Sequence, residues 1–577
     1  MSMTDTIAAR RAELERGFPE WTPRSLGRWL DVCALRYGPR EFVVTDHRTF
    51  SYREVSDWSR RLADGLVTIG VRPGDHVGML MANYPEFVAL KFAVARAGAV
   101  AVPMNFLYQR KELAYVLGQA RCRVLITMTG FAGLDYLEML DDIAPGWDSP
   151  GPKTLSSLPE LGNVVLLPTD GRTRDGVLTV EGLDGLGSTH TGVSEDRRPA
   201  PDSAGDILYT SGTTGKPKGV MVTHDAVQRT AYASALTRAF EDGRRILFSL
   251  PCYHMFGYLE GLLAAMTVGG AVILQTRFDP SDFLAGIERH RATDVLCVPT
   301  MTVALVQHPE LVKYDLSSLR AVLSGSAPGP AWLWERVATD LGATEIVTGY
   351  GMTECGGAMT LTLPEDPYTV TASTVGQPKW AGAAGIASRG GALTEYRAVD
   401  PVTGDFLPTG ETGELVSRGP TTMLGFWAKP DETAAALRDG WVHSGDLGRV
   451  GSDGYIQVTG RSKELYKSGG ELVMPKEIEE LLAGHPGISQ VYAIGIPDER
   501  WGEAGCACIV RAPGSTVTAA EVIDLCKAQL ARFKVPKHVW FLDAGDLPTT
   551  PTGKIQKFRL VEQAARQLAN DRLEQNA

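Results

Sequence analysis

The chain has 577 residues, of which 44% are hydrophobic and 22% are charged, and its formal net charge at pH 7 is -11. One hydrophobic core seldom exceeds about 250–300 residues, so this length predicts at least two packed units. An acidic surface repels nucleic acids and anionic membranes, which argues against both as partners. An anionic ligand would therefore need a local group of basic side chains and backbone amides.

Cysteine usage and the N-terminal segment predict a reduced, cytoplasmic protein. The eight cysteines are scattered, and the closest pair, Cys506 and Cys508, would share one face of a strand as buried hydrophobic residues. None of the ten histidines has the spacing of a metal-binding motif. The first residues are too charged for a signal peptide. Residues 259–274 are too few for a membrane span and include Glu260, so they predict a buried helix that runs into a strand.

Strand-like and helical patterns alternate along most of the chain. Residues 75–81 predict a strand, residues 85–97 a helix, and residues 98–103 a second buried strand. Apolar strands between helices are typical of layered α/β folds with largely parallel sheets. Residues 146–206, which are rich in Pro, Gly, Asp and Ser, predict a surface connection with a few short strands. Similar strand-like runs recur at residues 123–127, 270–274, 294–298, 321–324 and 345–348.

The sequence changes character after Gly440. Short strands near residues 454–459 lead into a Gly-Arg-Ser-Lys segment, and helical patterns follow at residues 475–483 and 519–532. We predict a domain boundary at residues 460–463, between a large α/β domain (1–459) and an α+β domain (464–577) of ordinary size.

The most informative motif is the run YTSGTTGKPKGV at residues 209–220. Glycines let backbone amides approach an anion closely, and hydroxyl groups and lysines bind it further. The run does not match the Walker A pattern, so it predicts a different kind of phosphate-binding loop. A flexible linker seldom continues into Lys-Pro-Lys-Gly-Val, which disfavours that alternative. The predicted phosphate-binding residues are Thr210, Ser211, Gly212, Thr213, Thr214, Gly215, Lys216 and Lys218.

This run resembles the phosphate-loop signature of the adenylate-forming superfamily, which includes acyl- and aryl-CoA synthetases, luciferases and the adenylation domains of peptide synthetases. Further segments resemble the other signatures of this superfamily, in the same order, and together they extend from about residue 25 to about residue 565. The resemblance implies a large N-terminal α/β domain and a smaller, mobile C-terminal domain. The matching segments are residues 251–257, 349–354, 413–415, 441–446, 460–463, 467–471 and 551–554.

The resemblance assigns roles at the nucleotide. Tyr350 would lie on the adenine, Thr353 would contact the α-phosphate, and Glu354 would help to hold Mg²⁺, whose preferred ligands are oxygen atoms. Asp446 would bind the ribose hydroxyls with help from Arg461. A structural turn is the alternative for each of these segments when it is taken alone. Gly349, Gly351 and Met352 complete the predicted nucleotide site.

The resemblance also assigns an acyl pocket. His254 and an aromatic neighbour would gate this pocket. We include His254 among the catalytic residues, but general-base catalysis is disfavoured because a carboxylic acid is already ionised near pH 7. The four probable wall segments, residues 253–257, 300–303, 324–327 and 349–352, contain no Lys, Arg, Asp or Glu. The predicted pocket residues are Tyr253, Phe256, Gly257, Gly325, Ser326 and Ala327.

Several C-terminal residues would act in one half-reaction each. Lys554 would bridge the carboxylate and the α-phosphate during adenylation, although a solvated surface lysine is the ordinary alternative. Lys463 would be the hinge. Leu472 stands where many relatives of the superfamily carry a polar residue. A second departure is the Gly/Ala-rich stretch of residues 382–392, which is longer than expected before the strand at residues 396–399. The face presented in the second half-reaction would include Lys467, Gly469, Gly470 and Glu471.

Together these features predict an ATP-dependent acyl-CoA synthetase that forms an acyl-adenylate and passes the acyl group to coenzyme A. ATP, Mg²⁺ and coenzyme A are the implied cofactors and co-substrates, and a hydrophobic acid is the expected substrate. The protein would act as a monomer or homodimer. Three alternatives remain, namely a luciferase-like or carrier-loading ligase, an amino-acid adenylation domain, and a nucleotide-binding protein without activity. Amino-acid adenylation domains place an Asp for the substrate amine near the position of His254-Met255, and its absence here argues against the second alternative. Lys554, Glu354 and Asp446 argue against the third.

Overall fold

The computed structural model describes residues 3–149, 155–210, 216–326, 329, 331–461, 464–468, 471–498, 502–549 and 555–575. The chain forms two compact units, which are described separately. The first consists of Met1–Glu395 and Ser417–Val442, and the second of Tyr396–Val416 and His443–Ala577. The predicted boundary at residues 460–463 stays a prediction, and two of its residues, Ser462 and Lys463, lie outside the described residues.

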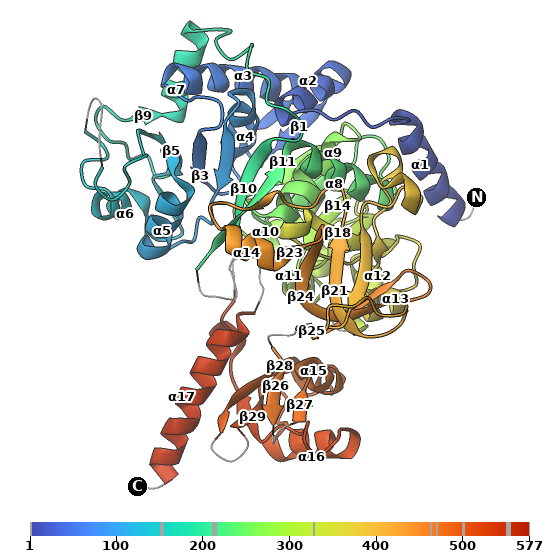
Figure 1. The fold of residues 1–577 in the computed structure, drawn as a ribbon. Coiled ribbons are helices and arrows are strands. Elements are labelled where there is room, and N and C mark those ends of the chain that lie inside the picture. The colour runs from blue at the N-terminus through green and yellow to red at the C-terminus, as the bar shows by residue number, and fades with distance from the viewer. Residues whose placement is uncertain are drawn as a thin grey trace. The chain divides into compact units, whose positions relative to one another are not determined.

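A seven-stranded sheet forms one half of the first unit (Figure 1). All neighbouring strands are parallel from β16 to β1, and only β2 is antiparallel. Most of these strands are buried along their whole length, which explains their uninterrupted apolar sequence. In spatial order the strands are β16 (Glu345–Val347), β15 (Ala321–Ser324), β14 (Asp294–Cys297), β12 (Arg245–Phe248), β13 (Ala271–Leu274), β1 (Glu41–Val44) and β2 (Thr49–Ser51).

An eight-stranded sheet forms the other half. Its strands are parallel from β10 to β9, and β11 and β22 continue it in antiparallel fashion. The order is β22 (Gly425–Phe426), β11 (Lys218–Thr223), β10 (Ala204–Thr210), β4 (Val100–Pro103), β3 (His76–Leu80), β5 (Cys122–Met128), β8 (Asn163–Leu167) and β9 (Leu178–Thr179). A small antiparallel sheet contains β17 (Gly349–Met352), β18 (Gly357–Leu361) and β19 (Gln377–Pro378), and β6 (Gly130–Phe131) pairs with β7 (Leu134–Asp135).

Helices cover the sheets of the first unit. Those of the first half of the chain are α1 (Met3–Gly17), α2 (Leu26–Tyr37), α3 (Tyr52–Thr68), α4 (Pro85–Arg96), α5 (Arg110–Ala120), α6 (Tyr136–Ile143), α7 (Val180–Thr189) and α8 (His224–Thr237). They are followed by η1 (Phe256–Leu263), α9 (Ala264–Met266), α10 (Pro280–His290), α11 (Pro299–Val306), η2 (Leu311–Lys313), α12 (Ala331–Asp340), η3 (Thr353–Cys355), α13 (Tyr368–Ser373), η4 (Gly382–Ala384), η5 (Ala387–Arg389) and α14 (Pro430–Ala436).

The second unit contains a mixed sheet that two helices cover on one face and one helix covers on the other. The sheet order is β27 (Glu471–Val473), β26 (Tyr466–Ser468), β29 (Gly502–Arg511) and β28 (Ile488–Asp498), and β30 (His538–Phe541) pairs with β29 in parallel. The helices are α15 (Pro475–Ala483), α16 (Ala519–Gln529), η6 (Ala544–Asp546) and α17 (Lys557–Gln575). A further sheet, whose residues are divided between the two units, contains β20 (Glu395–Val399), β21 (Gly413–Arg418), β24 (Trp441–Val450) and β23 (Leu437–Arg438), and β25 (Ile456–Arg461) pairs with β24.

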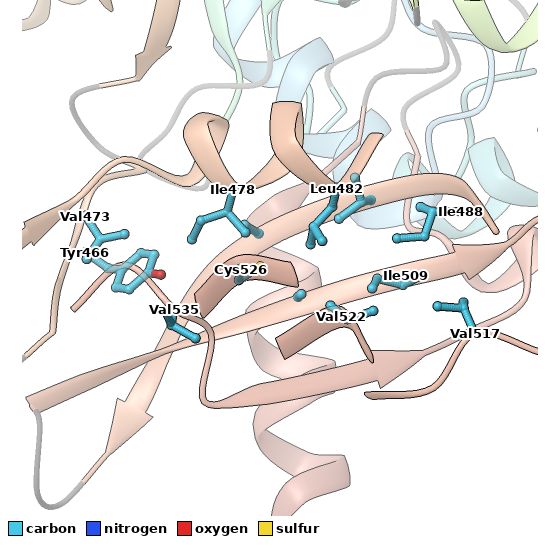
Figure 2. Close-up of a cluster of buried hydrophobic side chains, with 13 residues drawn as sticks. Tyr466, Val473, Ile478, Leu482, Ile488, Ile509, Val517, Val522, Cys526 and Val535 are labelled. Carbon is cyan, nitrogen blue, oxygen red and sulfur yellow. The ribbon is translucent and has the colours of Figure 1, made fainter. Parts of the chain in front are cut away.

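Alternate residues of β28 and β29 build two cores in the second unit. Ala507 and Ile509 belong to the core beneath α15 and α16. Figure 2 shows Ile478 and Leu482 of α15 in the same cluster as Ile509. Cys506 and Cys508 lie in the opposite core with Leu560 and Ala564 of α17. The two cysteines are buried and share one face, as predicted from their spacing.

The predicted fold class of a large α/β domain followed by a smaller α+β domain is confirmed, and most predicted elements are present with their ends shifted by one or two residues. Residues 259–274 form the end of η1, then α9 and β13, as expected for a buried helix that runs into a strand. No helix among the described residues is long and apolar enough to cross a membrane.

The prediction for residues 146–206 missed helix α7. Its sequence contains three glycines, which disfavour a helix. The structure gives the reason for one of them, because a Cβ atom on Gly187 would overlap the backbone of Arg61 in α3. A Cβ atom on Gly65 of α3 would likewise overlap the carbonyl oxygen of Leu183. The glycines therefore let α3 and α7 pack backbone to backbone, side by side in Figure 1.

Candidate active site

The carboxyl ends of four neighbouring parallel strands, β16, β15, β14 and β12, bring the predicted acyl-pocket segments together. The hydroxyl oxygens of Thr302 and Ser324 lie 2.9 Å apart, and both side chains are fully buried. A Cβ atom on Gly325 would lie 3.5 Å from the carbonyl oxygen of Gly349 and 3.8 Å from the ring of Phe256. All four segments thus meet at one edge of the sheet, where ligands of open α/β sheets usually bind.

The segment after β12 folds back sharply into η1, a helix with π-type hydrogen bonding. A Cβ atom on Gly257 would lie 2.6 Å from the carbonyl oxygen of Leu250 and 2.8 Å from that of Pro251. This close approach requires glycine at position 257 whether or not a ligand is bound. Helices of the π type are rare and are often found at functional sites.

His254 and Tyr253 are both partly buried at the start of η1. The backbone N–H of Phe256 donates to Nδ1 of His254 at 3.2 Å, so the neutral ring carries its proton on Nε2. Burial raises the pKa of Tyr253 well above its usual value, which keeps the phenol neutral. The ring of Tyr253 meets Phe106 edge to face, with the centroids 5.3 Å apart. The described walls of this region are therefore uncharged and largely aromatic or aliphatic.

Residues 349–354 form β17 and the first residues of the 3₁₀ turn η3. Cβ atoms on Gly349 and Gly351 would overlap the carbonyl oxygens of Thr360 and Gly357 on β18, so both positions need glycine. The hydroxyl of Thr360 accepts a hydrogen bond from the backbone N–H of Tyr350 at 3.2 Å. The motif is thus a strand packed unusually closely on its partner.

The side chains of this motif differ in exposure. Thr353 is buried, whereas Tyr350, Met352 and Glu354 are partly exposed. Among the described residues, no group of three or more His, Cys, Asp or Glu side chains could hold a metal ion. A single carboxylate at Glu354 nevertheless fits Mg²⁺, which commonly binds one or two protein carboxylates, water and the phosphates of the substrate.

The predicted phosphate segment joins two antiparallel strands, β10 and β11. Thr210 at the end of β10 pairs with Lys218 at the start of β11. The Nζ of Lys218 lies 5.2 Å from the ring centroid of Phe426, and that of Lys216 lies 5.5 Å from the ring centroid of Tyr115. An antiparallel strand follows the segment, whereas a helix follows the loop of a Walker A motif, so the segment differs from Walker A as the sequence indicated. Residues 211–215 lie outside the described residues.

A buried ion pair at β10, the strand that leads to this segment, was not predicted from the sequence. The ammonium of Lys91 in α4 contacts Asp206 of β10, and both side chains are inaccessible to solvent. The hydroxyl of Tyr258 in η1 lies 3.4 Å from the second oxygen of Asp206, and the Lys91 ammonium lies 4.8 Å from the centroid of the Tyr258 ring. Burial raises the pKa of Asp206 and lowers that of Lys91, and each is opposed by the charge of the other. The signal in the sequence was one lysine inside the apolar run of residues 87–95 in α4.

In the second unit, Asp446 and Arg461 occupy paired positions on β24 and β25. Arg461 Nε lies 2.8 Å from Asp446 Oδ1, and the Asp446 side chain is almost fully buried. Glu414 accepts a hydrogen bond from the backbone N–H of Gly445 at 3.0 Å and lies 3.0 Å from the ring of His443. The structure thus brings together Asp446 and Arg461, to which the sequence assigned one role, and it adds Glu414, which contacts the turn before Asp446.

The described residues do not include every predicted site residue. Lys467 and Glu471 lie in the antiparallel strands β26 and β27, where Lys467 pairs with Leu472 and Ser468 with Glu471. The predicted residues outside the described ones are Ser211, Gly212, Thr213, Thr214, Gly215, Ala327, Lys463, Gly469, Gly470 and Lys554.

Comparisons with known proteins agree with this architecture. Residues 30–427 match the AMP-binding enzyme family, and residues 477–554 match the AMP-binding enzyme C-terminal domain. The chain is 36% identical over 539 residues to a feruloyl-CoA synthase of Amycolatopsis sp, covering 92% of this chain and 98% of the relative. It is 33% identical over 551 residues to a mitochondrial medium-chain acyl-CoA ligase of Danio rerio, covering 93% of this chain and 88% of the relative.

Two solved structures are similar along almost their whole length. The anthranilate CoA ligase AuaEII in complex with anthranoyl-AMP superposes with a TM-score of 0.81 at 27% identity, over 95% of this chain and 98% of that one. ATP-bound MatB from Rhodopseudomonas palustris superposes with a TM-score of 0.80 at 29% identity, over 93% of this chain and 99% of that one. With the motifs and the fold, these similarities show that the chain belongs to the adenylate-forming superfamily of AMP-binding enzymes, among the AMP-forming acyl-CoA synthetases and ligases.

Proposed function

We propose that this enzyme activates an uncharged, hydrophobic carboxylic acid with ATP and transfers the acyl group to coenzyme A. The observation that carries the proposal is the meeting of the four wall segments at the carboxyl edge of the seven-stranded sheet. Phe256, Gly325 and Gly349 approach each other there, and the four segments contain no Lys, Arg, Asp or Glu.

In the first half-reaction, a carboxylate oxygen attacks the α-phosphorus of ATP, and pyrophosphate leaves with the electron pair of the broken P–O bond. The amides and hydroxyls of residues 210–216 would bind the phosphates, and Thr353 would contact the α-phosphate. Lys554 would stabilise the charge that builds between carboxylate and phosphate. Mg²⁺ held by Glu354 would supply further charge neutralisation on the phosphate oxygens.

In the second half-reaction, the thiol of coenzyme A attacks the acyl carbonyl, and AMP leaves as the C–O bond of the mixed anhydride breaks. Asp446 and Arg461 would hold the ribose of the nucleotide through both steps. The segment at residues 467–471 would serve the thiol step, and Lys554 the adenylation step. We place a hinge at residues 460–463 so that one small domain can serve both steps in turn.

The wall segments favour an acid with an apolar tail. A charged group on that tail would lose its hydration without gaining a partner, which costs several kcal/mol. The relatives named for feruloyl and medium-chain acids are consistent with either a ring or an alkyl tail. Each additional buried methylene should strengthen binding by about 0.8 kcal/mol until the pocket is full.

A panel of acetate, hexanoate, decanoate, palmitate, benzoate, a dicarboxylic acid and an amino acid tests the proposal. Pyrophosphate exchange reports adenylation of each acid, and the appearance of the CoA thioester reports transfer. We expect kcat/KM to rise from acetate to the longer or ring-containing acids. A preference for acetate, the dicarboxylic acid or the amino acid would show that the pocket walls are misassigned. Exchange without thioester formation would indicate a different acceptor, such as a carrier protein.

A further inference from the structure

Lys557, the first residue of α17, occupies a three-membered ion cluster in the second unit. Its ammonium lies 2.7 Å from Glu479 Oε1 of α15 and 3.0 Å from Glu464 Oε2. The same oxygen of Glu479 accepts a hydrogen bond from the backbone N–H of Ala493 on β28 at 2.8 Å. The cluster therefore fastens the start of α17 to α15, to β28 and to the segment that contains Glu464.

The cluster joins two segments that flank predicted functional elements. Glu464 directly follows the proposed hinge at residues 460–463, and Lys557 lies three residues after Lys554. The described residues on both sides of residues 550–554 are tied together, because Thr549 forms a β-bridge with Ile555 and the N–H of Gln556 donates to the carbonyl oxygen of Pro548 at 2.8 Å. Lys557 continues from this tie into α17.

The three charged side chains are less exposed to solvent than those of an ordinary surface ion pair. The side chain of Lys557 is 18% exposed, and those of Glu479 and Glu464 are 20% and 32% exposed. Burial alone lowers the pKa of Lys557, but the two carboxylates outweigh it and leave the pKa raised. The ammonium therefore stays charged at neutral pH. Its loss would leave two partly buried carboxylates without their shared partner, which is far more disruptive than losing an exposed pair.

The hydrophobic core of α17 does not need this cluster. Leu560 and Ala564 are fully buried in the core that contains Cys506 and Cys508, and they fix the helix to the sheet. Lys557 instead fixes the first turn of the helix, where the chain arrives from Lys554. The apolar residues of α17 therefore attach the helix to the sheet, and Lys557 fixes the position of its first turn.

We propose that Lys557 is a positioning residue for the adenylation half-reaction, which holds the segment bearing Lys554 in a fixed relation to the chain that leaves the hinge. This inference rests on the proposed function, because it assigns Lys554 to adenylation. It predicts that breaking the cluster harms adenylation selectively, since the thiol step uses a different segment of the same domain.

The test compares Lys557→Met with Lys557→Arg and with a matched control, Lys534→Met. Lys534 forms an ion pair with Glu477 of α15 in the same unit, and these side chains are 25% and 39% exposed. Each variant is assayed for acid-dependent pyrophosphate exchange and for thioester formation from synthetic acyl-adenylate and coenzyme A. Thermal unfolding confirms that each variant is folded at the assay temperature.

For Lys557→Met we expect kcat of exchange to fall about 10- to 100-fold, the loss that a small misplacement of a catalytic group causes, with KM for ATP unchanged. Thioester formation from the adenylate should stay within about twofold of wild type, because positioning of Lys554 is not needed there. Lys557→Arg should recover most of the exchange activity, and Lys534→Met should keep both activities.

Equal losses in both half-reactions, or a loss of exchange no larger than in Lys534→Met, would overturn the proposal. If Lys557→Met does not fold, Glu464→Gln decides instead, because it removes one arm of the cluster and leaves the pair with Glu479. A selective loss of exchange supports the proposal there, and unchanged exchange contradicts it. Absence of acid-dependent exchange in the wild-type enzyme would contradict the proposed function itself, which keeps the two failures distinct.

Discussion

Lys91 and Asp206 form an ion pair whose two side chains are both sealed from solvent, between α4 and the strand that leads to the phosphate segment. Tyr258, the residue after Gly257 in η1, contacts both members of the pair. The strand that carries the phosphate segment and the helix that begins in the acyl segment therefore share one buried polar cluster. This cluster can keep the two halves of the adenylation site in a fixed relation.

Lys91→Met should destabilise the first unit by about 3–5 kcal/mol, because it leaves the carboxylate of Asp206 buried without a counter-charge. The double variant Lys91→Met/Asp206→Asn should recover part of that loss, since no buried charge remains. Chemical unfolding followed by a probe in the first unit measures both. A double variant no more stable than Lys91→Met would show that the charge imbalance is not the cause.

Gly351→Ala should raise KM for ATP by at least about tenfold, because the new methyl group would overlap the carbonyl oxygen of Gly357 and displace β17. The matched control is Gly185→Ala in α7, where a Cβ atom would have nothing within 4 Å. That control should keep KM and be as stable as wild type or more stable, since alanine favours a helix. An unchanged KM for ATP in Gly351→Ala would show that the position of β17 does not matter for nucleotide binding.

His224→Leu should flatten the dependence of stability on pH. Burial, with a smaller effect of Lys91, lowers the pKa of His224 to about 3 from 6.5, and neither ring nitrogen has a hydrogen-bond partner among the described residues. Between these values the unfolded chain binds a proton that the folded chain does not, so wild-type stability should fall as pH decreases from 6.5 towards 3, by up to about 1.4 kcal/mol per pH unit.

Thermal midpoints of wild type and His224→Leu between pH 4.5 and 7 measure this difference. The two curves should diverge progressively below pH 6.5, with the variant the more stable at the acidic end. His47→Leu, at an exposed position, serves as the control and should follow the wild-type curve. Parallel curves for wild type and His224→Leu would mean that His224 does not sense the pH in this range.

Local signals in the sequence were sufficient for many elements of the fold. Residues 85–97 carry Pro at the helix start and an apolar run that only Lys91 interrupts between residues 87 and 95, and α4 forms there. Apolar runs such as residues 321–324 became fully buried strands because both faces of a parallel sheet are covered. Since the carboxyl ends of neighbouring strands meet, the motifs that follow β12, β15 and β16 also converge.

Features that depend on partners distant in the sequence could not be predicted. The residues around Lys91 give no sign of its ion pair with Asp206, 115 residues away. The residues around Lys557 likewise give no sign of its ion pair with Glu464. The glycines of α7 oppose a helix in isolation, and only the close approach of α3 explains them. The π-type turns of η1 and the close packing at Gly257 near its start are likewise not revealed by any helical pattern.

Lys554→Ala should lower the rate of adenylate formation by about 10²–10³-fold while sparing ATP binding. The charge that builds between carboxylate and α-phosphate would lose a preorganised cation in this variant. Conversion of synthetic acyl-adenylate and coenzyme A to thioester should continue. Pyrophosphate exchange measures the first step and direct thioester assays the second; near-wild-type exchange would remove Lys554 from the catalytic assignment.

Lys463→Pro should block thioester formation more than adenylation. Proline fixes its own φ angle and restricts the residue before it, so a pivot at this position would lose the backbone freedom that a change between the two steps requires. Acyl-AMP should then accumulate on the enzyme, and a quenched single-turnover assay would detect it. Lys463→Ala is the control, because it removes the same side chain but keeps the backbone free, and it should turn over close to the wild-type rate. If Lys463→Pro and Lys463→Ala behave alike, either the pivot lies elsewhere or the two half-reactions need no rotation at this position.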